Sequence, residues 1–117
     1  MKIKTGALVR TMKDHTSYKV EQQALQVTIE EVRQAQAALP DEEKDPGAVN
    51  RVEAQLAETV AVMPSIESKI ETWVGDLEGI MATIEDSCAT NMEAVRETED
   101  WQKAEAAIAQ ARTFASE

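Results

Sequence analysis

One stretch decides the fold of this chain: VNRVEAQLAETVAVMPSIESKIETWVGDLEGIMATI, residues 49–84. Apolar residues recur along it at alternating steps of three and four. This is the 3.5-residue period of a helix that packs lengthwise against another helix. Thr59 is the one polar position in the series. We call the series the middle seam, and it contains Val49, Val52, Leu56, Thr59, Met63, Ile66, Ile70, Trp73, Leu77, Ile80 and Ile84.

Pro64 lies inside the middle seam. Proline removes a backbone hydrogen bond and clashes with the preceding turn, so it can end a helix. However, the three–four register passes through Pro64 without a slip, and Met63 is a poor N-cap residue. We therefore expect one continuous helix that is kinked at Pro64, and a break into two helices is the alternative.

Punctuation on both sides of this stretch divides the chain into three segments. Pro40 disfavours helical geometry at the residue before it, and Asp45 followed by Pro46 offers an N-cap with proline at the first helical position. Further on, Thr90 and Glu93 have the spacing of a capping box, which restarts a helix. The predicted helices are about 3–39, 46–86 and 91–115.

The outer segments carry stripes of the same period. The first segment has two stripes, which indicate two neighbouring helices. We call the longer one the first seam, and it contains Leu8, Met12, His15, Tyr18, Gln22, Leu25, Ile29, Val32, Gln36 and Leu39. The second stripe contains Val9, Thr16, Val20, Ala24 and Val27. The last segment has an alanine-rich seam with Trp101, Ala104, Ile108, Ala111 and Ala115.

Short connections make successive helices antiparallel. The sequence thus predicts an all-α fold: an elongated, antiparallel up-down-up three-helix bundle with coiled-coil-like packing, forming a single domain over residues 1–117. The predicted helix over 3–39 would be about 55 Å long at 1.5 Å per residue. Such a rod has long faces and little concavity, which disfavours an enclosed active site.

The composition supports this fold and argues against several functions. The strong helix formers Ala, Glu, Gln, Lys, Arg, Leu and Met supply 64 of the 117 residues, which favours helices throughout. No apolar run reaches the roughly 18 residues of a membrane span, and the N-terminus lacks the apolar region of a secretory signal. A net charge of −10 argues against nucleic-acid binding. We therefore expect a cytoplasmic protein that binds neither membranes nor nucleic acids.

Catalytic and metal chemistry find little support. His15 is the single histidine and Cys88 the single cysteine, whereas zinc sites recruit several such ligands. Residues 41–45, DEEKD, resemble the start of a calcium loop. However, Pro46 stands where glycine is required and Val52 where a bidentate glutamate is required. We predict a protein that is not an enzyme and has no cofactor or metal.

The charge is unevenly distributed. Residues 1–20 contain five basic side chains and one acidic side chain, which gives +4, whereas residues 21–117 contain 7 basic and 21 acidic ones, which gives −14. We predict that the basic end docks onto an acidic partner surface, with charge steering the encounter. A solvated face without a partner is the alternative. The candidate residues in this basic end are Lys2, Lys4, Arg10 and Lys13.

The same end of the chain resembles a known family. Residues 2–6, KIKTG, followed by Arg10 and Tyr18, resemble the N-terminal signature of the tubulin-binding cofactor A family. Met63-Pro64 is similar to that family's apolar-proline pair in the middle helix. Residues 99–104, EDWQKA, are similar to its Glu-Glu-Tyr-x-x-Ala stretch, with tryptophan at the tyrosine position. The likeness spans nearly the whole chain, and the family has the three-helix rod reached above.

The resemblance implies a cytoplasmic, cytoskeleton-associated chaperone that captures β-tubulin folding intermediates before the α/β heterodimer assembles. It adds Tyr18 to the candidate partner-binding residues. Trp101 is a further candidate, because a large ring in an alanine-rich segment can protrude, although a core position is the alternative. The other functional hypothesis is a structural coiled-coil subunit or adaptor that assembles with other helical chains. The sequence leaves monomer and homodimer open.

Overall fold

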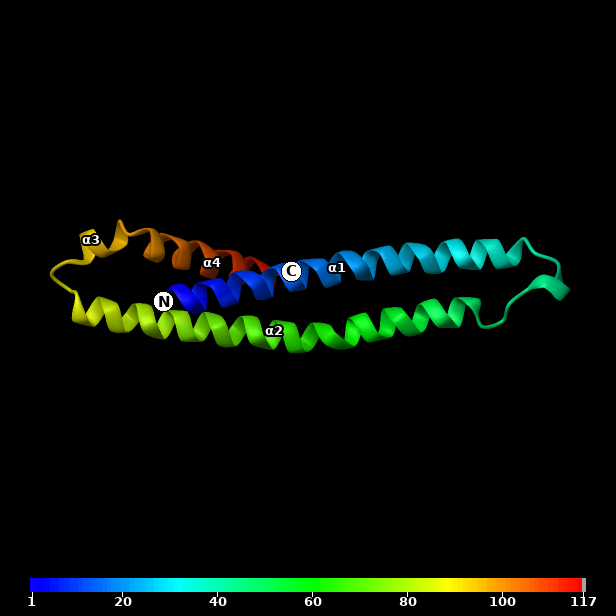
Figure 1. Cartoon of the computed structure of the whole chain (residues 1–117), viewed down its shortest axis with the longest axis horizontal. Coiled ribbons are helices and arrows are strands. Elements are labelled where there is room, and N and C mark those ends of the chain that lie inside the picture. Colours follow the sequence, from blue (N-terminus) through cyan, green and yellow to red (C-terminus); the bar gives the residue numbers. More distant parts are fainter. Residues whose placement is uncertain (117) are drawn as a thin grey trace. The chain divides into compact units, whose positions relative to one another are not determined.

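The computed structural model describes the backbone of residues 1–116 and the side chains of residues 1–114. Position 115 of the predicted last seam therefore lies outside the described side chains. Helices account for 88% of the residues whose backbone is described and none of these residues lies in a strand, which confirms the all-α prediction. The elements, labelled in Figure 1, are α1 (Lys2–Ala37), the 3₁₀ helix η1 (Asp41–Glu43), α2 (Ala48–Ser87), α3 (Met92–Arg96) and α4 (Glu99–Ser116).

The chain divides into two compact units. The terminal unit contains residues 1–14 and 66–117, and the hairpin unit contains residues 15–65. The terminal unit thus holds the first turns of α1, the second half of α2, and all of α3 and α4. The hairpin unit holds the rest of α1, η1 and the first half of α2. The organisation of the chain as a single domain stays a prediction.

The connection between α1 and α2 follows the expected punctuation with small shifts. Helix α1 ends at Ala37, shortly before Pro40, whose backbone is extended at φ −59° and ψ 150°. Helix α2 begins at Ala48, two residues later than predicted. The reason is a turn before the helix, in which Asp45 Oδ1 accepts a hydrogen bond of 2.9 Å from the backbone N–H of Gly47. Asp45 therefore caps the turn that leads into α2.

The predicted helix over 91–115 is wrong in one respect: it is two helices, α3 and α4. Asn91, at the N-cap position of α3, makes no capping hydrogen bond with its side chain. The hydroxyl of Thr98 instead accepts a bond of 3.3 Å from the backbone N–H of Trp101. Thr98 thereby satisfies an N–H in the first turn of α4 and sets where that helix begins.

Helix α2 passes through Pro64 without interruption. The prediction of a continuous helix is therefore confirmed, and the alternative of two separate helices is excluded. A bend at Pro64 stays a prediction. The side chain of Pro64 is exposed, because Pro64 stands between the seam residues Met63 and Ile66 and is not itself one of the packed positions.

The structure confirms the register of both seams. Every position of the middle seam and every position of the first seam is buried or half-buried. His15 belongs to this set, because its side chain is 5% exposed. In the last segment, Trp101, Ala104, Ile108 and Ala111 are all buried. A 3.5-residue period therefore located the packed face of each long helix.

The second stripe of α1 behaves differently along its length. Val9, in the terminal unit, is half-buried, whereas Val20 and Val27, in the hairpin unit, are 59% and 58% exposed. The hairpin unit contains segments of only two α-helices, α1 and α2. In that unit α1 therefore has one helical neighbour, and the second stripe has nothing of its own unit to pack against.

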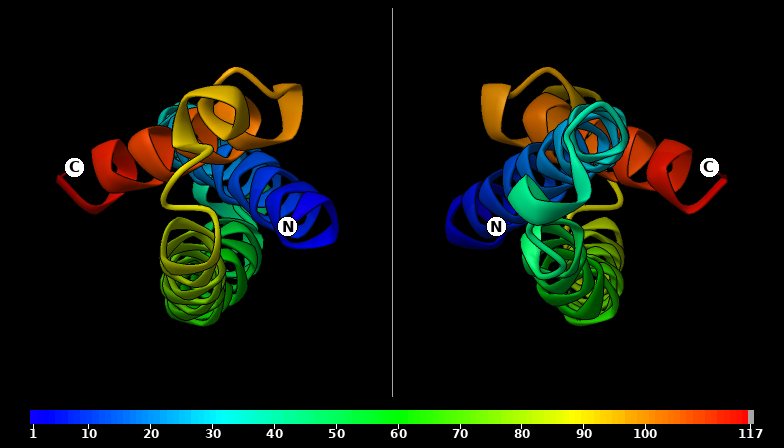
Figure 2. Two further views of the ribbon diagram at one scale, coloured as in Figure 1. Left: turned by 90° about the vertical axis from the view of Figure 1, so that its left-hand side faces the viewer. Right: turned by 90° about the vertical axis from the view of Figure 1, so that its right-hand side faces the viewer.

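The terminal unit has one core, to which α1, α2 and α4 contribute the largest buried side chains. Its largest fully buried side chains are Leu8, Met12, Leu77 and Trp101, contributed by α1, α2 and α4. The Glu78 carboxylate of α2 binds Arg112 of α4 at 2.5 Å, and Figure 2 shows α3 and α4 on one side of this unit and α2 on the other. Met81 is also buried, outside the middle seam, and it lines one groove together with Ile108 of α4.

Candidate partner-binding surface

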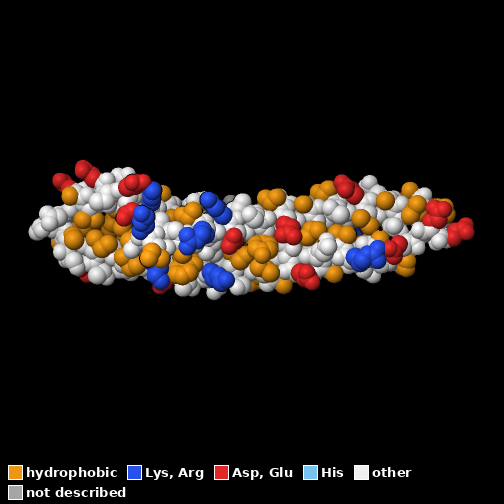
Figure 3. Space-filling model, in the orientation of Figure 1, with side chains coloured by type: hydrophobic (Ala, Val, Ile, Leu, Met, Phe, Trp, Pro, Cys, Tyr) orange, Lys and Arg blue, Asp and Glu red, His pale blue; other side chains and the backbone are white. Residues whose placement is uncertain are grey.

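Many basic side chains are paired within the molecule. The ion pairs are Lys4–Asp76, Arg33–Glu53, Lys44–Asp41, Arg51–Asp45, Lys103–Glu99 and Arg112–Glu78. In contrast, Lys2, Arg10, Lys13 and Lys69 are exposed, and none has a carboxylate partner within the part of the chain that the structure describes. We call these four residues the basic surface. Figure 3 shows Lys and Arg side chains gathered where Figure 1 draws the first turns of α1.

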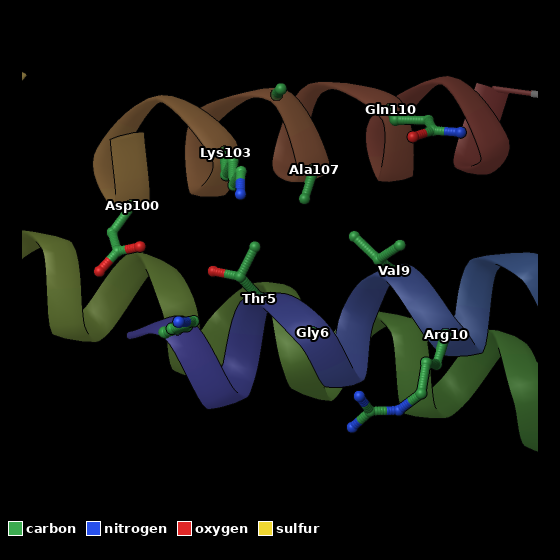
Figure 4. Close-up of a pocket in the computed structure, with 10 residues that line it drawn as sticks. Thr5, Gly6, Val9, Arg10, Asp100, Lys103, Ala107 and Gln110 are labelled. Carbon is green, nitrogen blue, oxygen red and sulfur yellow. The ribbon is translucent and has the colours of Figure 1, made fainter. Parts of the chain in front are cut away.

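A groove of about 560 Å³ lies between α1 and α4 in the terminal unit. Three cations line it, Lys2, Arg10 and Lys103, against one acid, Asp100. The rest of the lining is small or uncharged: Thr5, Gly6, Val9, Ala106, Ala107 and Gln110. Figure 4 shows Val9 pointing from α1 toward α4, and Lys103 and Ala107 pointing from α4 toward α1. The groove thus has an apolar floor and an excess of positive charge, which suits a carboxylate-bearing segment.

A second groove, of about 480 Å³, lies between α1 and α2 in the same unit. Its cations are Arg10, Lys13 and Lys69, and Asp14 is its acid. The remaining lining is Ala7, Thr11 and Trp73. Arg10 lines both grooves. The basic surface therefore extends across α1 from one groove to the other, and Arg10 is the residue that the two grooves share.

Lys4 differs from the other basic candidates. Its ammonium lies 3.4 Å from Asp76 Oδ2 and 4.8 Å from the centroid of the Trp73 ring. Lys4 is half-buried, so it joins α1 to α2 within the terminal unit. Its charge is already neutralised there, and its main contribution is to packing.

The two aromatic candidates occupy packed positions. Trp101 is 1% exposed, and its Nε1–H donates a hydrogen bond of 2.7 Å to Glu105 Oε1. Trp101 therefore lies in the core of the terminal unit and does not offer its ring to a partner. Tyr18 is half-buried on the first seam of the hairpin unit. The structure thus brings Lys2, Arg10 and Lys13 together in one unit, while Tyr18 belongs to the other.

The cation contributed by α4 is held in its charged form. Lys103 Nζ lies 2.6 Å from Glu99 Oε1. The hydrogen bond to Glu99 raises the pKa of Lys103 above its usual value, and the same bond lowers the pKa of Glu99. Both groups are exposed, so this pair adds little to stability. Because Glu99 compensates the charge of Lys103, the excess of positive charge at the α1–α4 groove comes from Lys2 and Arg10 against Asp100.

Sequence reasoning missed two contributors to these grooves, Lys69 and Lys103. Both come from segments with many acidic residues, so neither forms part of a basic region in the sequence. One signal was present in the sequence: Lys69 precedes Trp73 by four residues, so the two share a helix face. Lys103 lies within the residues 99–104 that resemble a family motif.

A comparison with protein families decides the assignment. The model of the family described as tubulin binding cofactor A matches residues 1–108. The chain belongs to the tubulin-binding cofactor A family. The match contains the whole basic surface and both grooves except Gln110. No curated protein and no solved structure matches the chain.

Membership of the tubulin-binding cofactor A family makes the chain a tubulin-folding cofactor. Such a cofactor is of the chaperone type and is not an enzyme. Among the described residues, no cluster of three His, Cys, Asp or Glu side chains could hold a metal ion. None of the described helices is both long enough and apolar enough to cross a membrane.

Proposed function

We propose that this chain captures β-tubulin folding intermediates in the cytoplasm, where they are held until the α/β-tubulin heterodimer assembles. The family supports a tubulin partner. The observation that carries the choice of surface is the basic surface: Lys2, Arg10, Lys13 and Lys69 lack internal carboxylate partners among the described residues, in a protein of net charge −10. Uncompensated charge of this kind favours an acidic partner.

The proposed mechanism divides the work between charge and apolar contact. The basic surface steers the encounter and fixes orientation, because exposed charges act mainly on association rate and specificity. Apolar helix surface next to it supplies most of the affinity, as it does at other protein interfaces. Lys4 contributes indirectly, because its contacts with Asp76 and Trp73 join α1, which carries most of the basic surface, to α2. Tyr18 stays a candidate contact on the hairpin unit.

The second candidate function is that of a structural subunit, either as a homodimer or with other helical chains. The observation that favours it is the second stripe of α1 in the hairpin unit, where Val20 and Val27 are more than half exposed. Apolar side chains spaced seven residues apart are typical of helix–helix contacts. Such a contact would leave the basic surface without a role.

One experiment separates the two functions. Size-exclusion chromatography with light scattering is run on the chain alone, on β-tubulin alone and on the mixture. The proposal predicts a new species whose mass equals one β-tubulin plus the cofactor. Self-association of the chain, with β-tubulin eluting unchanged, would favour the structural role and overturn the proposal.

A further inference from the structure

Gly6 and Arg10 form a close pair on α1. A methyl group placed on Gly6 would stand 3.3 Å from Arg10 Nη1, which is tighter than an ordinary van der Waals contact. Figure 4 shows the Arg10 side chain folded back beneath Gly6. The guanidinium therefore lies along the backbone of α1, and it would have to shift by a few tenths of an ångström to make room for a methyl group at position 6.

The backbone does not explain why glycine stands at position 6. No described glycine has a positive φ, so Gly6 is not needed for a left-handed conformation. Glycine inside a helix is less stable than alanine by roughly 0.5–1 kcal/mol. Gly75 and Gly79, inside α2, have no atom within 4 Å of such a methyl group. What distinguishes Gly6 from these two is the neighbouring guanidinium.

The hairpin unit also contains a glycine close to the guanidinium of an arginine, and there the guanidinium binds a carboxylate. A methyl group on Gly47 would stand 3.0 Å from Arg51 Nη1, again four residues away. Arg51 is hydrogen-bonded to the Asp45 carboxylate. In the turn before α2, the Arg51 guanidinium next to Gly47 thus binds a carboxylate, together with the Gly47 N–H. Asp45 stands two residues before Gly47, whereas the residue two before Gly6 is Lys4. Arg10 therefore has no carboxylate at the equivalent position.

We propose that Arg10 anchors a carboxylate of tubulin and that Gly6 is the residue that positions it. A guanidinium offers a planar fork of donors that matches a carboxylate, which an ammonium does not. Arg10 is exposed, has no carboxylate partner among the described residues and lines both grooves. Lys2 adds positive charge on one side of Arg10, and Lys13 and Lys69 add it on the other, whereas the charge of Lys103 is paired with Glu99. This inference rests on the proposed function and names the group that the partner supplies.

The test compares the affinity of β-tubulin for Gly6→Ala, Arg10→Lys and Arg10→Gln with that of the unchanged chain. Gly79→Ala is the matched control, because it makes the same change in a helix with open space around it. Arg10→Gln should weaken binding about tenfold, the effect of one charge-assisted hydrogen bond. Arg10→Lys should weaken it nearly as much, since the charge remains but the fork is lost.

The decisive variant is Gly6→Ala. It should raise thermal stability, as Gly79→Ala should, because alanine is the better helix former. It should nevertheless weaken β-tubulin binding by about threefold or more, since it displaces the guanidinium, and it should add nothing in the Arg10→Gln background. Normal binding by Gly6→Ala and Arg10→Lys would overturn the inference while leaving the proposed function intact. Failure of the unchanged chain to bind β-tubulin would overturn both.

Discussion

The ammonium of Lys4 lies over the ring of Trp73, 4.8 Å from its centroid. The same ammonium is 3.4 Å from Asp76 Oδ2. A cation above an indole face is attracted by the ring electrons, and a nearby carboxylate adds to this attraction. Lys4 is therefore a structural contact between α1 and α2, although it stands in the same basic motif as Lys2 and Arg10.

Replacing Lys4 by methionine should lower the free energy of unfolding by about 1 kcal/mol. The variant keeps the apolar stem and removes the cation, and exposed cation–π and ion pairs each contribute up to about that amount. Lys13→Met is the matched control, because Lys13 is exposed and without a carboxylate partner among the described residues. Urea unfolding measures both variants. Equal stability of the two would show that Lys4 does not hold α1 to α2.

Truncating Leu77 should be far more costly. Leu77 is fully buried between the helices of the terminal unit, so Leu77→Ala removes packed methyl groups and leaves a cavity. Such changes cost about 2–5 kcal/mol. Val27→Ala removes apolar atoms from an exposed position and should change stability by about 0.5 kcal/mol or less. Similar losses for the two variants would contradict the register assigned to the middle seam.

The start of α4 depends on Thr98. Its hydroxyl accepts the backbone N–H of Trp101, so Thr98→Ala leaves that donor without its capping partner. The expected loss is about 1 kcal/mol in the free energy of unfolding. Thr90→Ala, at the position where the sequence suggested a cap, should have no measurable effect. If Thr90→Ala lowered the free energy of unfolding more than Thr98→Ala did, the assignment of the cap to Thr98 would be wrong.

Acid should weaken the turn before α2 through Asp45. The hydrogen bond from Arg51, followed by that from the Gly47 N–H, lowers the pKa of Asp45 below 3.8. Because the folded pKa is depressed, the stabilisation is present above the unfolded pKa and is lost as pH falls through the folded pKa.

The variant Asp45→Asn tests this effect through thermal unfolding at several pH values. It should melt below the unchanged chain near neutral pH, where the carboxylate is ionised. The difference should shrink as pH falls through the pKa of Asp45, because the unchanged chain then loses the same interaction. A difference that stays constant over the acidic range would show that the charge of Asp45 contributes nothing to stability.

Periodicity was enough to locate the packed faces, because burial of an apolar stripe is a property of one helix. It placed Leu8 and Leu77 correctly for that reason. It could not show along which part of its length a stripe packs against another helix, because that depends on other segments of the chain. The exposure of Val20 was missed for this reason. The split between α3 and α4 was missed because a threonine cap at Thr98 carries no glycine or proline signal.

The candidate surface was predictable only in part. The basic end was visible as an excess of charge in residues 1–20. Which of those cations are neutralised depends on residues far along the chain: Asp76 pairs with Lys4, whereas Arg10 receives no carboxylate from the described residues. The closeness of Gly6 to the Arg10 guanidinium depends on a side-chain conformation. No sequence pattern alone indicates it.

The most direct test of the account compares two variants that have the same net charge. The first carries Lys2→Gln, Arg10→Gln and Lys13→Gln, and omits Lys4 because of its structural contacts. The second carries Gln23→Glu, Gln26→Glu and Gln55→Glu at exposed positions of the hairpin unit. Each set changes the net charge from −10 to −13, because the first removes three positive charges and the second adds three negative ones. Circular dichroism checks that both keep their helices.

The measurement is the rate of β-tubulin capture by the two variants at low and high salt. We predict that the variant without Lys2, Arg10 and Lys13 captures β-tubulin about tenfold more slowly than the other at low salt, as local charge steering requires. The gap should close as salt rises, because the Debye length falls from about 10 Å at 0.1 M to about 3 Å at 1 M. Equal capture rates for the two variants at low salt would contradict the basic surface as the docking site for tubulin.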